Sequence, residues 1–206
     1  MPPCGLLRDA RSVRYAALVS ADMEAQELHE SDRGLVVVYT GNGKGKTTAA
    51  MGLALRAAGY GKQVLVIQFV KTWFTGEKGG FEPLTNVEFI QAGKGFYKIL
   101  GDKLPEAEHV DAAKEAFDLA QAKVMSGNYD VVVLDEIIGS VTGGLLPLEP
   151  LLDLIDKKPP LLDLVLTGHR GKELPQLLER ADLITEMVKV KHPYDSGILA
   201  KKSIDY

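Results

Sequence analysis

The chain has 206 residues, of which 46% are hydrophobic and 25% are charged, and its formal net charge is −4. Such a chain is long enough for one α/β domain with a sizeable core, and its slightly acidic balance gives no electrostatic case for binding nucleic acid. The single cysteine, Cys4, excludes a disulfide within the chain and fits a reducing compartment. No apolar run reaches the roughly 18–20 residues that a membrane helix needs, and residues 1–20 make no convincing secretory signal, so we expect a cytoplasmic protein without membrane contact.

The beginning of the chain differs in composition from the rest. Three arginines between residues 8 and 14 precede an acidic stretch at residues 22–32. We interpret residues 1–33 as an N-terminal arm, partly helical or mobile, and residues 34–206 as a single α/β domain.

From residue 34 onward, apolar runs typical of strands alternate with helical patterns. The runs are continuous in Val, Leu and Ile, which is typical of strands that are buried on both faces of a parallel sheet. Alternation of strands with helices favours an α/β fold with right-handed crossovers. The predicted strands span residues 35–39, 64–69, 87–91, 131–134, 162–166 and 183–188, and the predicted helices span 47–58, 106–126, 148–156 and 172–180.

A glycine-rich turn at residues 40–48 follows the first predicted strand and leads into the first predicted helix. Its sequence, Thr-Gly-Asn-Gly-Lys-Gly-Lys-Thr-Thr, is a variant of the phosphate-binding pattern G-x-x-x-x-G-K-[ST], with Thr40 in place of the first glycine. Backbone N–H groups of residues 43–48 can point into one concavity, and the N-terminus of the helix adds to the attraction for phosphate. Lys46 supplies a charge for phosphate oxygens, and Thr47 supplies a hydroxyl for Mg²⁺.

Two acidic residues, Asp135 and Glu136, follow the buried run at residues 131–134. In P-loop proteins the acid at such a strand end orients Mg²⁺ directly or through water, and we expect this strand to lie beside the strand of the phosphate turn. Since adjacent residues of a strand point to opposite faces, one acid should face the metal while the other supports it or enters the next turn. These features predict a P-loop NTPase-like (RecA-like) α/β fold, with a mostly parallel sheet and helices on both faces.

Two long connections, residues 71–83 and 93–105, are rich in glycine. Ligands of open α/β sheets bind at the carboxyl ends of the strands, where such loops gather. We therefore expect these loops to hold a second substrate.

Seven sequence motifs occur in order through the domain. They are Thr40 to Ala50, Gln68-Phe69-Val70-Lys71, Val133-Leu134-Asp135-Glu136, Leu146-Pro147-Leu148, Thr167-Gly168, Val190 to Gly197 and the ending Ile204-Asp205-Tyr206. On these residues the chain resembles the ATP:corrinoid adenosyltransferases of the CobA/CobO/BtuR type over about residues 33–206.

The resemblance implies that ATP donates its 5′-deoxyadenosyl group to the cobalt of a reduced corrinoid, in adenosylcobalamin biosynthesis or salvage. Cob(I) would be the nucleophile, C5′ of ATP the electrophile and inorganic triphosphate the leaving group. The protein would position ATP and the corrinoid, stabilise the leaving triphosphate with Mg²⁺ as cofactor, and exclude water. In this family ATP lies reversed in the phosphate loop relative to most P-loop enzymes, which would leave C5′ exposed to the corrinoid. The family also implies a homodimer and a reduced flavoprotein as electron donor.

The resemblance assigns roles to the residues at matching positions. Lys46, Thr47 and Glu136 are implied in catalysis, and Thr47 and Glu136, with Asp135 beside them, in binding the metal. The residues implied in binding ATP or the corrinoid are Gly41, Asn42, Gly43, Lys44, Gly45, Lys46, Thr47, Thr48, Arg56 and Phe96.

The corrinoid side of the pattern departs from the family. The family has a Gly-Phe-x-Trp segment whose aromatic residues help to displace the lower axial ligand of cobalt, and this chain reads Gly95-Phe96-Tyr97-Lys98. Phe96 matches, but Lys98 stands where the family has tryptophan. Either Tyr97 compensates for this change, or the preferred corrinoid lacks a strong lower ligand.

Two histidines, His169 and His192, lie in or beside segments that the family shares. One hypothesis is that a histidine ligates cobalt. Imidazole has many other roles, and we favour a hydrogen-bonded structural role for both residues.

Three other interpretations stay open at this point. A P-loop kinase needs cations around the transferred phosphoryl group, and after Arg56 the chain contains only Arg170 and Arg180, neither in a basic cluster. An NTP-hydrolysing switch protein would generally need an arginine finger, which the N-terminal arm could supply in trans, and a residue that orients water. A non-enzymatic nucleotide-binding module is disfavoured by the intact Lys46, Thr47 and acid pair.

Overall fold

The computed structural model describes residues 33–71, 74–95 and 104–205. The predicted N-terminal arm, except Arg33, lies outside these residues, and so do Phe96, Tyr97 and Lys98. The division of the chain at residue 33 therefore stays a prediction.

Six strands of the described chain form one sheet, and every pair of neighbours in it runs parallel. The predicted α/β fold with a parallel sheet is thereby confirmed, and each predicted strand matches an observed strand to within two residues. In sheet order the strands are β3 (Val87–Gln91), β2 (Val64–Gln68), β4 (Val131–Asp135), β5 (Asp163–Thr167), β1 (Val36–Thr40) and β6 (Leu183–Glu186).

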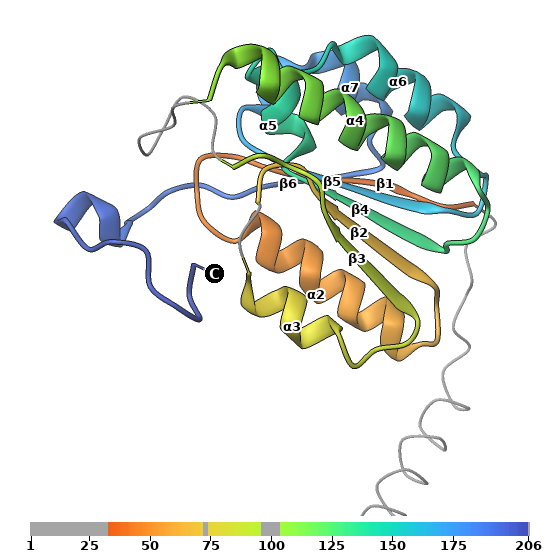
Figure 1. Cartoon of the computed structure of the whole chain (residues 1–206), viewed down its shortest axis with the longest axis horizontal. Coiled ribbons are helices and arrows are strands. Elements are labelled where there is room, and N and C mark those ends of the chain that lie inside the picture. Colours follow the sequence, from red (N-terminus) through yellow and green to blue (C-terminus); the bar gives the residue numbers. More distant parts are fainter. Residues whose placement is uncertain (1–32, 72–73, 96–103, 206) are drawn as a thin grey trace, which may run out of the picture. The chain divides into compact units, whose positions relative to one another are not determined.

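Helices cover both faces of the sheet, with α2 and α3 on one side and α4 to α7 on the other (Figure 1). The sequence does not predict α3 and α5, because six residues are too few for a helical period to be recognised. The predicted helix at residues 172–180 is divided at Pro175, which has no backbone N–H and starts α7. The elements are α2 (Lys46–Gly59), α3 (Gly76–Phe81), α4 (Glu106–Met125), α5 (Ile137–Thr142), α6 (Leu148–Lys157), α7 (Pro175–Arg180) and the 3₁₀ turns η1 (Gly171–Glu173) and η2 (Pro193–Ser196).

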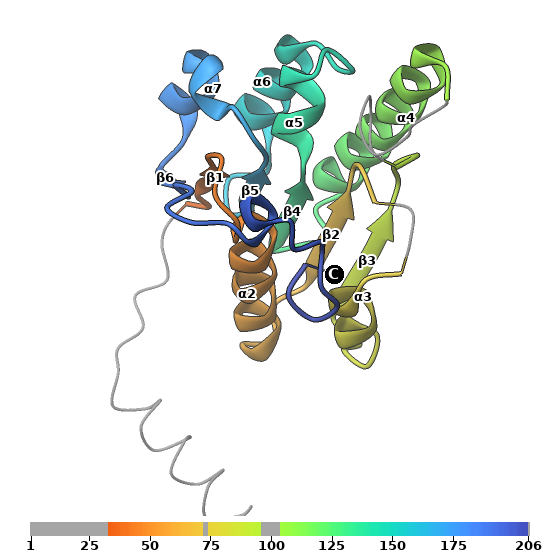
Figure 2. The same ribbon diagram turned by 90° about the vertical axis from the view of Figure 1, so that its left-hand side faces the viewer.

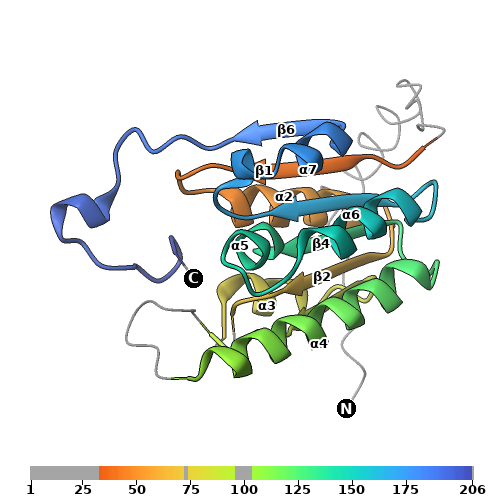
Figure 3. The ribbon, with the colours of Figure 1, turned by 90° about the horizontal axis from the view of Figure 1, so that it is seen from above.

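One expectation about the topology is wrong. β5 lies between β1 and β4, so the strand that carries Asp135 is not the neighbour of the strand that leads into the phosphate turn (Figure 3). Crossover connections and packing set the strand order, and the composition of one strand does not reveal it. Since the strands are parallel, their carboxyl ends still share one edge, where Thr40, Gln68, Asp135 and Thr167 end β1, β2, β4 and β5.

The hydrophobic core has two parts, one on each face of the sheet. On the α2 face, Ala50, Met51 and Ala54 are buried against the strands. Alanine side chains allow a close approach of helix and sheet. This packing fixes the first turn of α2, and with it Lys46 and Thr47, at the carboxyl edge of the sheet.

The core on the other face can be tested at Leu154 in α6, whose side chain is 1% exposed, against Leu161, which is 70% exposed. We expect Leu154→Ala to lower the free energy of unfolding by about 2–5 kcal/mol, because the change removes buried methyl groups and leaves a cavity. The same change at Leu161 should alter it by less than about 0.5 kcal/mol. Urea unfolding followed by circular dichroism measures both variants, and equal losses would contradict the place of Leu154 in the core.

Candidate active site

The phosphate turn has two glycines in the left-handed region, Gly41 with φ 105° and Gly45 with φ 117°. Gly45 is the residue before α2, and its conformation directs the chain into the first turn of that helix. A Cβ on Gly41 would lie 2.3 Å from the carbonyl oxygen of Met187, so only glycine fits there. Thr40, which replaces the first glycine of the pattern, ends β1, and its Oγ1 accepts a hydrogen bond of 2.9 Å from the N–H of Gly171.

The segment that follows β6 passes across the N-terminal end of α2 (Figure 2) and is hydrogen-bonded to the phosphate turn. Met187 donates its N–H to the Thr40 carbonyl at 2.8 Å, and its own carbonyl accepts from the N–H of Gly43 at 2.7 Å. The Asn42 Oδ1 accepts from the N–H of Lys189 at 3.0 Å. The N–H of Gly43 is therefore used within the protein, which corrects the expectation that it points into the phosphate concavity.

Lys46 begins α2 and is only 5% exposed. Its Nζ donates a hydrogen bond of 2.8 Å to the carbonyl oxygen of Gly43, which folds the side chain back over the turn. Burial lowers the pKa of Lys46, and the nearby Glu136 and Asp135 oppose that shift. A bound phosphate would also stabilise the ammonium form of Lys46, as these two carboxylates do.

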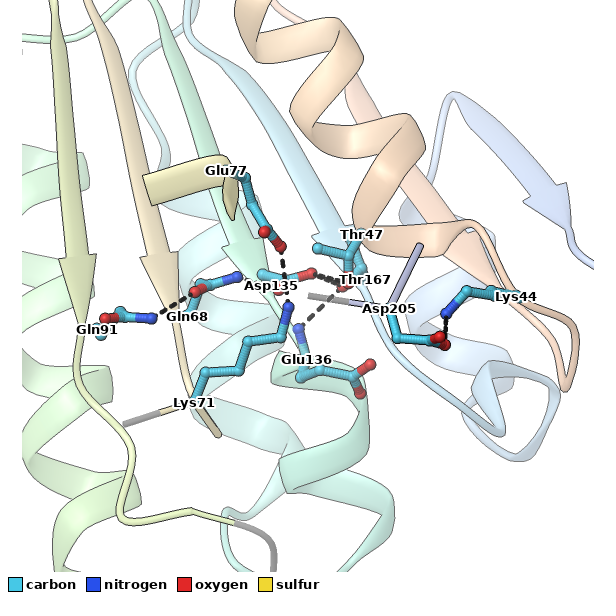
Figure 4. Close-up of polar contacts among 10 residues, drawn as sticks. All are labelled: Lys44, Thr47, Gln68, Lys71, Glu77, Gln91, Asp135, Glu136, Thr167 and Asp205. Atoms are coloured by element: carbon cyan, nitrogen blue, oxygen red, sulfur yellow. Dashed lines mark hydrogen bonds and ion pairs between the residues drawn. The ribbon is translucent and has the colours of Figure 1, made fainter. Parts of the chain in front are cut away.

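The carboxylate of Asp135 is the centre of a buried hydrogen-bond network (Figure 4). Its Oδ1 accepts from the hydroxyl of Thr47 at 2.9 Å and from the hydroxyl of Thr167 at 2.7 Å. Its Oδ2 accepts from the Nε2 of Gln68 at 3.0 Å. Asp135 thus holds Thr47 through a hydrogen bond and does not itself line the cavity that lies over the phosphate turn.

Glu136 is the residue between β4 and α5, and it adopts a left-handed conformation with φ 65°. Its N–H donates to the Thr167 hydroxyl at 2.9 Å, while its side chain enters the cavity. A Cβ on Gly139 would come within 2.9 Å of the Glu136 carboxylate, so this glycine leaves room for it. Burial, helped by the charge of Asp135, raises the pKa of Glu136 to about 7, against the effect of Lys46 and Lys71.

A cavity of about 570 Å³ lies over the phosphate turn. It brings together Asn42 to Thr48 and Glu136 from the predicted site. The sequence assigned no role by name to seven further lining residues, Met51, Lys71, Gly76, Glu77, Ser203, Ile204 and Asp205. Three of them, Lys71, Gly76 and Glu77, lie in the connection at residues 71–83 that we expect to hold a second substrate, and Lys71 and Asp205 lie in motifs that carry the family resemblance.

Two ion pairs stand in the wall of this cavity (Figure 4). Lys71 and Glu77 are joined at 3.0 Å between Nζ and Oε1. Lys44 of the phosphate turn pairs with Asp205 near the end of the chain. The turn is thus bordered by α3 on one side and by the C-terminal segment on the other.

Some predicted residues do not join this group. Arg56 is exposed in the last turn of α2 and does not line the cavity, and Phe96 lies outside the described residues. His169 and His192 line the cavity, and both have hydrogen-bond partners. His169 bonds to the backbone of Gly41, and the Nδ1 of His192 accepts from the N–H of Tyr194 at 3.2 Å. These contacts fit the structural role that we favour for both histidines.

The oxygen atoms around Thr47 and Glu136 suit a hard cation. Within residues 33–71, 74–95 and 104–205, no group of three His, Cys, Asp or Glu side chains could by itself hold a metal ion. Mg²⁺ bound with a nucleotide needs only one or two protein oxygens, since phosphates and waters supply the rest. Because the Thr47 hydroxyl donates its hydrogen to Asp135, its lone pairs are directed away from that carboxylate and can face a cation. The donor set therefore fits Mg²⁺ that arrives with a triphosphate.

The described part of the chain contains no helix that is long and apolar enough to span a membrane.

Comparison with known proteins identifies the family. The family model described as ATP:corrinoid adenosyltransferase BtuR/CobO/CobP matches residues 32–206. The corrinoid adenosyltransferase of Escherichia coli (strain K12) is 39% identical over 181 residues, which are 86% of this chain and 88% of that protein. Corrinoid adenosyltransferase CobA of Salmonella typhimurium (strain LT2) is 38% identical over 181 residues, again 86% and 88% of the two chains. The corrinoid adenosyltransferase of a Sinorhizobium species is 32% identical over 203 residues, which are 96% of this chain and 92% of that protein. The chain therefore belongs to the ATP:corrinoid adenosyltransferase family.

Proposed function

We propose that this protein transfers the 5′-deoxyadenosyl group of ATP to the cobalt of a reduced corrinoid and releases inorganic triphosphate. The observation that carries the proposal is the cavity over the phosphate turn, lined by Lys46, Thr47 and Glu136, in a chain of this family. The electron pair of Co(I) attacks C5′, the bond between C5′ and O5′ breaks, and the triphosphate leaves with that electron pair. No side chain has to act as a nucleophile.

The residues of the turn would stabilise the triphosphate as it leaves. Lys46 reaches into the turn, and Lys44 stands at its rim. The first N–H groups of α2 have no partner within the helix and can donate to phosphate oxygens. Negative charge builds up on the triphosphate as the bond to C5′ breaks, so its interactions with these cations and N–H groups become stronger. Interactions that are stronger in the transition state lower the barrier of the transfer. We therefore assign binding and catalysis to Asn42 through Thr48, with Lys46 as the main cation.

Thr47 and Glu136 would hold Mg²⁺, and Asp135 would orient Thr47 from below through its hydrogen bond of 2.9 Å. When bound, the ion neutralises part of the charge of the triphosphate. Glu136 would then be a carboxylate, because a nearby cation lowers its pKa.

The cations of the cavity argue against a phosphoryl-transfer enzyme. Among the described residues that line it, the cations are lysines and none is an arginine. Arg170 and Arg180 are engaged elsewhere, with Glu173 and Asp156 respectively. Kinases and switch NTPases generally place an arginine at the reacting phosphate.

Two further parts of the proposal rest on the family resemblance. The protein would act as a homodimer, and a reduced flavoprotein would supply the electrons that produce Co(I). A third part rests on the sheet geometry. The connections at residues 71–83 and 93–105, which follow the carboxyl ends of strands, would hold the corrinoid.

The products of one incubation test the function. Protein is mixed anaerobically with Mg-ATP and chemically reduced cobalamin, and the products are separated by chromatography. We expect light-sensitive adenosylcobalamin and triphosphate in equal amounts. ADP and phosphate, with the cobalamin unchanged, would refute the transfer.

Lys46→Ala tests the cation of the turn. We expect kcat/KM to fall by a factor on the order of 10²–10³, because a charge that stabilises the leaving group is lost. Lys157→Ala removes an exposed lysine of α6 and should leave the rate within about twofold. Formation of adenosylcobalamin, followed by absorbance, measures both variants. Full turnover by Lys46→Ala would show that ATP reacts elsewhere.

Glu136→Gln tests the raised pKa in the protein free of nucleotide and metal. Between the unfolded pKa of roughly 4.3 and the folded pKa of about 7, the folded state keeps a proton that the unfolded state releases. The contribution of Glu136 to stability therefore falls as the pH rises through this window. Glutamine does not titrate, so the Glu136→Gln variant should not lose this contribution. We therefore expect the free energy of unfolding of the variant minus that of the wild type to increase between pH 5 and pH 7.5, by at most a few kcal/mol.

The matched control is Glu115→Gln, at an exposed position of α4, which should follow the wild-type profile. Urea unfolding at several pH values gives the comparison. A difference between Glu136→Gln and wild type that does not depend on pH would show that Glu136 is not buried as a neutral acid.

A further inference from the structure

Gln68 is a buried polar residue that the proposed mechanism does not use. It ends β2, and its side chain is fully buried, with 0% exposure. In the register of the sheet it lies directly between Asp135 of β4 and Gln91 of β3. A buried carboxamide is costly unless its donor and acceptor groups are both satisfied, so its contacts deserve an explanation.

The hydrogen bonds on either side of Gln68 run in one direction along a chain. Lys78 Nζ donates to Gln91 Oε1 at 3.2 Å, and Gln91 Nε2 donates to Gln68 Oε1 at 3.1 Å; Figure 4 shows Gln91, Gln68 and Asp135 in a row. Gln68 Nε2 then donates to Asp135 Oδ2 at 3.0 Å. A lysine ammonium stands at one end and a carboxylate at the other, and hydrogen bonds aligned in this way polarise one another. The NH₂ group of Gln68 faces Asp135, because a carboxylate can only accept hydrogen bonds.

This contact decides how the Asp135 carboxylate is turned. Oδ2 is held by Gln68, so Oδ1 is left to accept from the hydroxyls of Thr47 and Thr167. Without the Gln68 donor, the carboxylate could rotate about its Cβ–Cγ bond, since that torsion is broad. Rotation would lengthen the hydrogen bond to Thr47 and release the Thr47 hydroxyl from the orientation in which its lone pairs could face a cation.

We propose that Gln68 is a positioning residue, which holds Asp135 so that Thr47 is oriented toward the Mg²⁺ that accompanies ATP. The inference rests on the proposed function, because it assumes that Mg-ATP binds over the phosphate turn. Gln68 touches neither ATP nor the metal. Its effect should therefore be confined to the part of ATP binding that depends on Mg²⁺.

The test compares ATP binding with and without Mg²⁺ by isothermal titration calorimetry. Gln68→Met keeps the length of the side chain and removes its donor. We expect the affinity for ATP in the presence of Mg²⁺ to fall about tenfold, because a hydrogen bond to a charged group is lost. The affinity for ATP in EDTA should change by less than about threefold. Gln68→Asn keeps the amide but is too short to reach Asp135, and it should show the same pattern if the Met variant does not fold.

The matched control is Gln91→Met, the same change one strand further from Asp135. Gln91→Met removes the donor to Gln68 Oε1, but a carboxylate only accepts hydrogen bonds, so the NH₂ group of Gln68 keeps facing Asp135. The affinity in Mg²⁺ should therefore stay within about threefold of the wild-type value, less than the loss of a hydrogen bond to a charged group. Equal losses with and without Mg²⁺ in the Gln68 variants would mean a merely structural role and would overturn the proposal. Wild-type binding that does not depend on Mg²⁺ would overturn it as well.

Binding is measured without turnover, so the two proposals can fail separately. If the wild type binds Mg-ATP but forms no adenosylcobalamin, the proposed function fails and the result for Gln68 still stands. If adenosylcobalamin forms at the wild-type rate and with the wild-type Mg²⁺ requirement in both Gln68 variants, the proposed function stands and the positioning role fails.

Discussion

The buried carboxylate of Asp135 is the constraint on which the rest of the site depends. A carboxylate that is 1% exposed is tolerated only when donors surround it, and here the donors come from three separate parts of the chain. The hydroxyl of Thr47 comes from the first turn of α2, that of Thr167 from the end of β5, and the amide of Gln68 from the end of β2. Satisfying one charge therefore fixes the start of α2 against the sheet. It also explains how β5 can separate β1 from β4 without separating their functional residues, since Thr167 bridges the gap.

The electrostatics of the cavity favour a ligand that carries charges of both signs. Burial lowers the pKa of Lys46 and raises that of Glu136, so both side chains are pushed toward their neutral forms. A bound anion restores the ammonium, and a bound cation restores the carboxylate. A triphosphate that enters together with Mg²⁺ does both at once, whereas either ion alone relieves only one of the two shifts. The triphosphate leaves as an anion, so the ammonium of Lys46 and the Mg²⁺ held by a carboxylate are needed at that step too.

Much of this arrangement could be predicted from the sequence, and the exceptions have physical causes. The strands were predictable because continuous Val, Leu and Ile runs are needed on both faces of the sheet, and the turn at residues 40–48 because glycines are needed for its left-handed residues. The order of the strands was not, since it follows from the crossovers and not from any single run. The individual roles of Lys71, Glu77 and Asp205 in the cavity wall were missed as well, although the connection at residues 71–83 is expected to hold a ligand. Those residues meet the turn only through tertiary packing, and neither α3 nor the C-terminal segment carries a readable period.

The position of Asp205 has a practical consequence for how the protein is handled. This residue lines the cavity over the phosphate turn and pairs with Lys44, and its backbone neighbour Ile204 lines the same cavity. A group attached to this segment, such as a purification tag or a fluorescent fusion, would therefore lie beside the lining of the cavity. It would add bulk there and, in the case of a histidine tag, metal-binding groups that compete for Mg²⁺. Affinity measured on a protein that carries such a group would report on the tag as well as on the site.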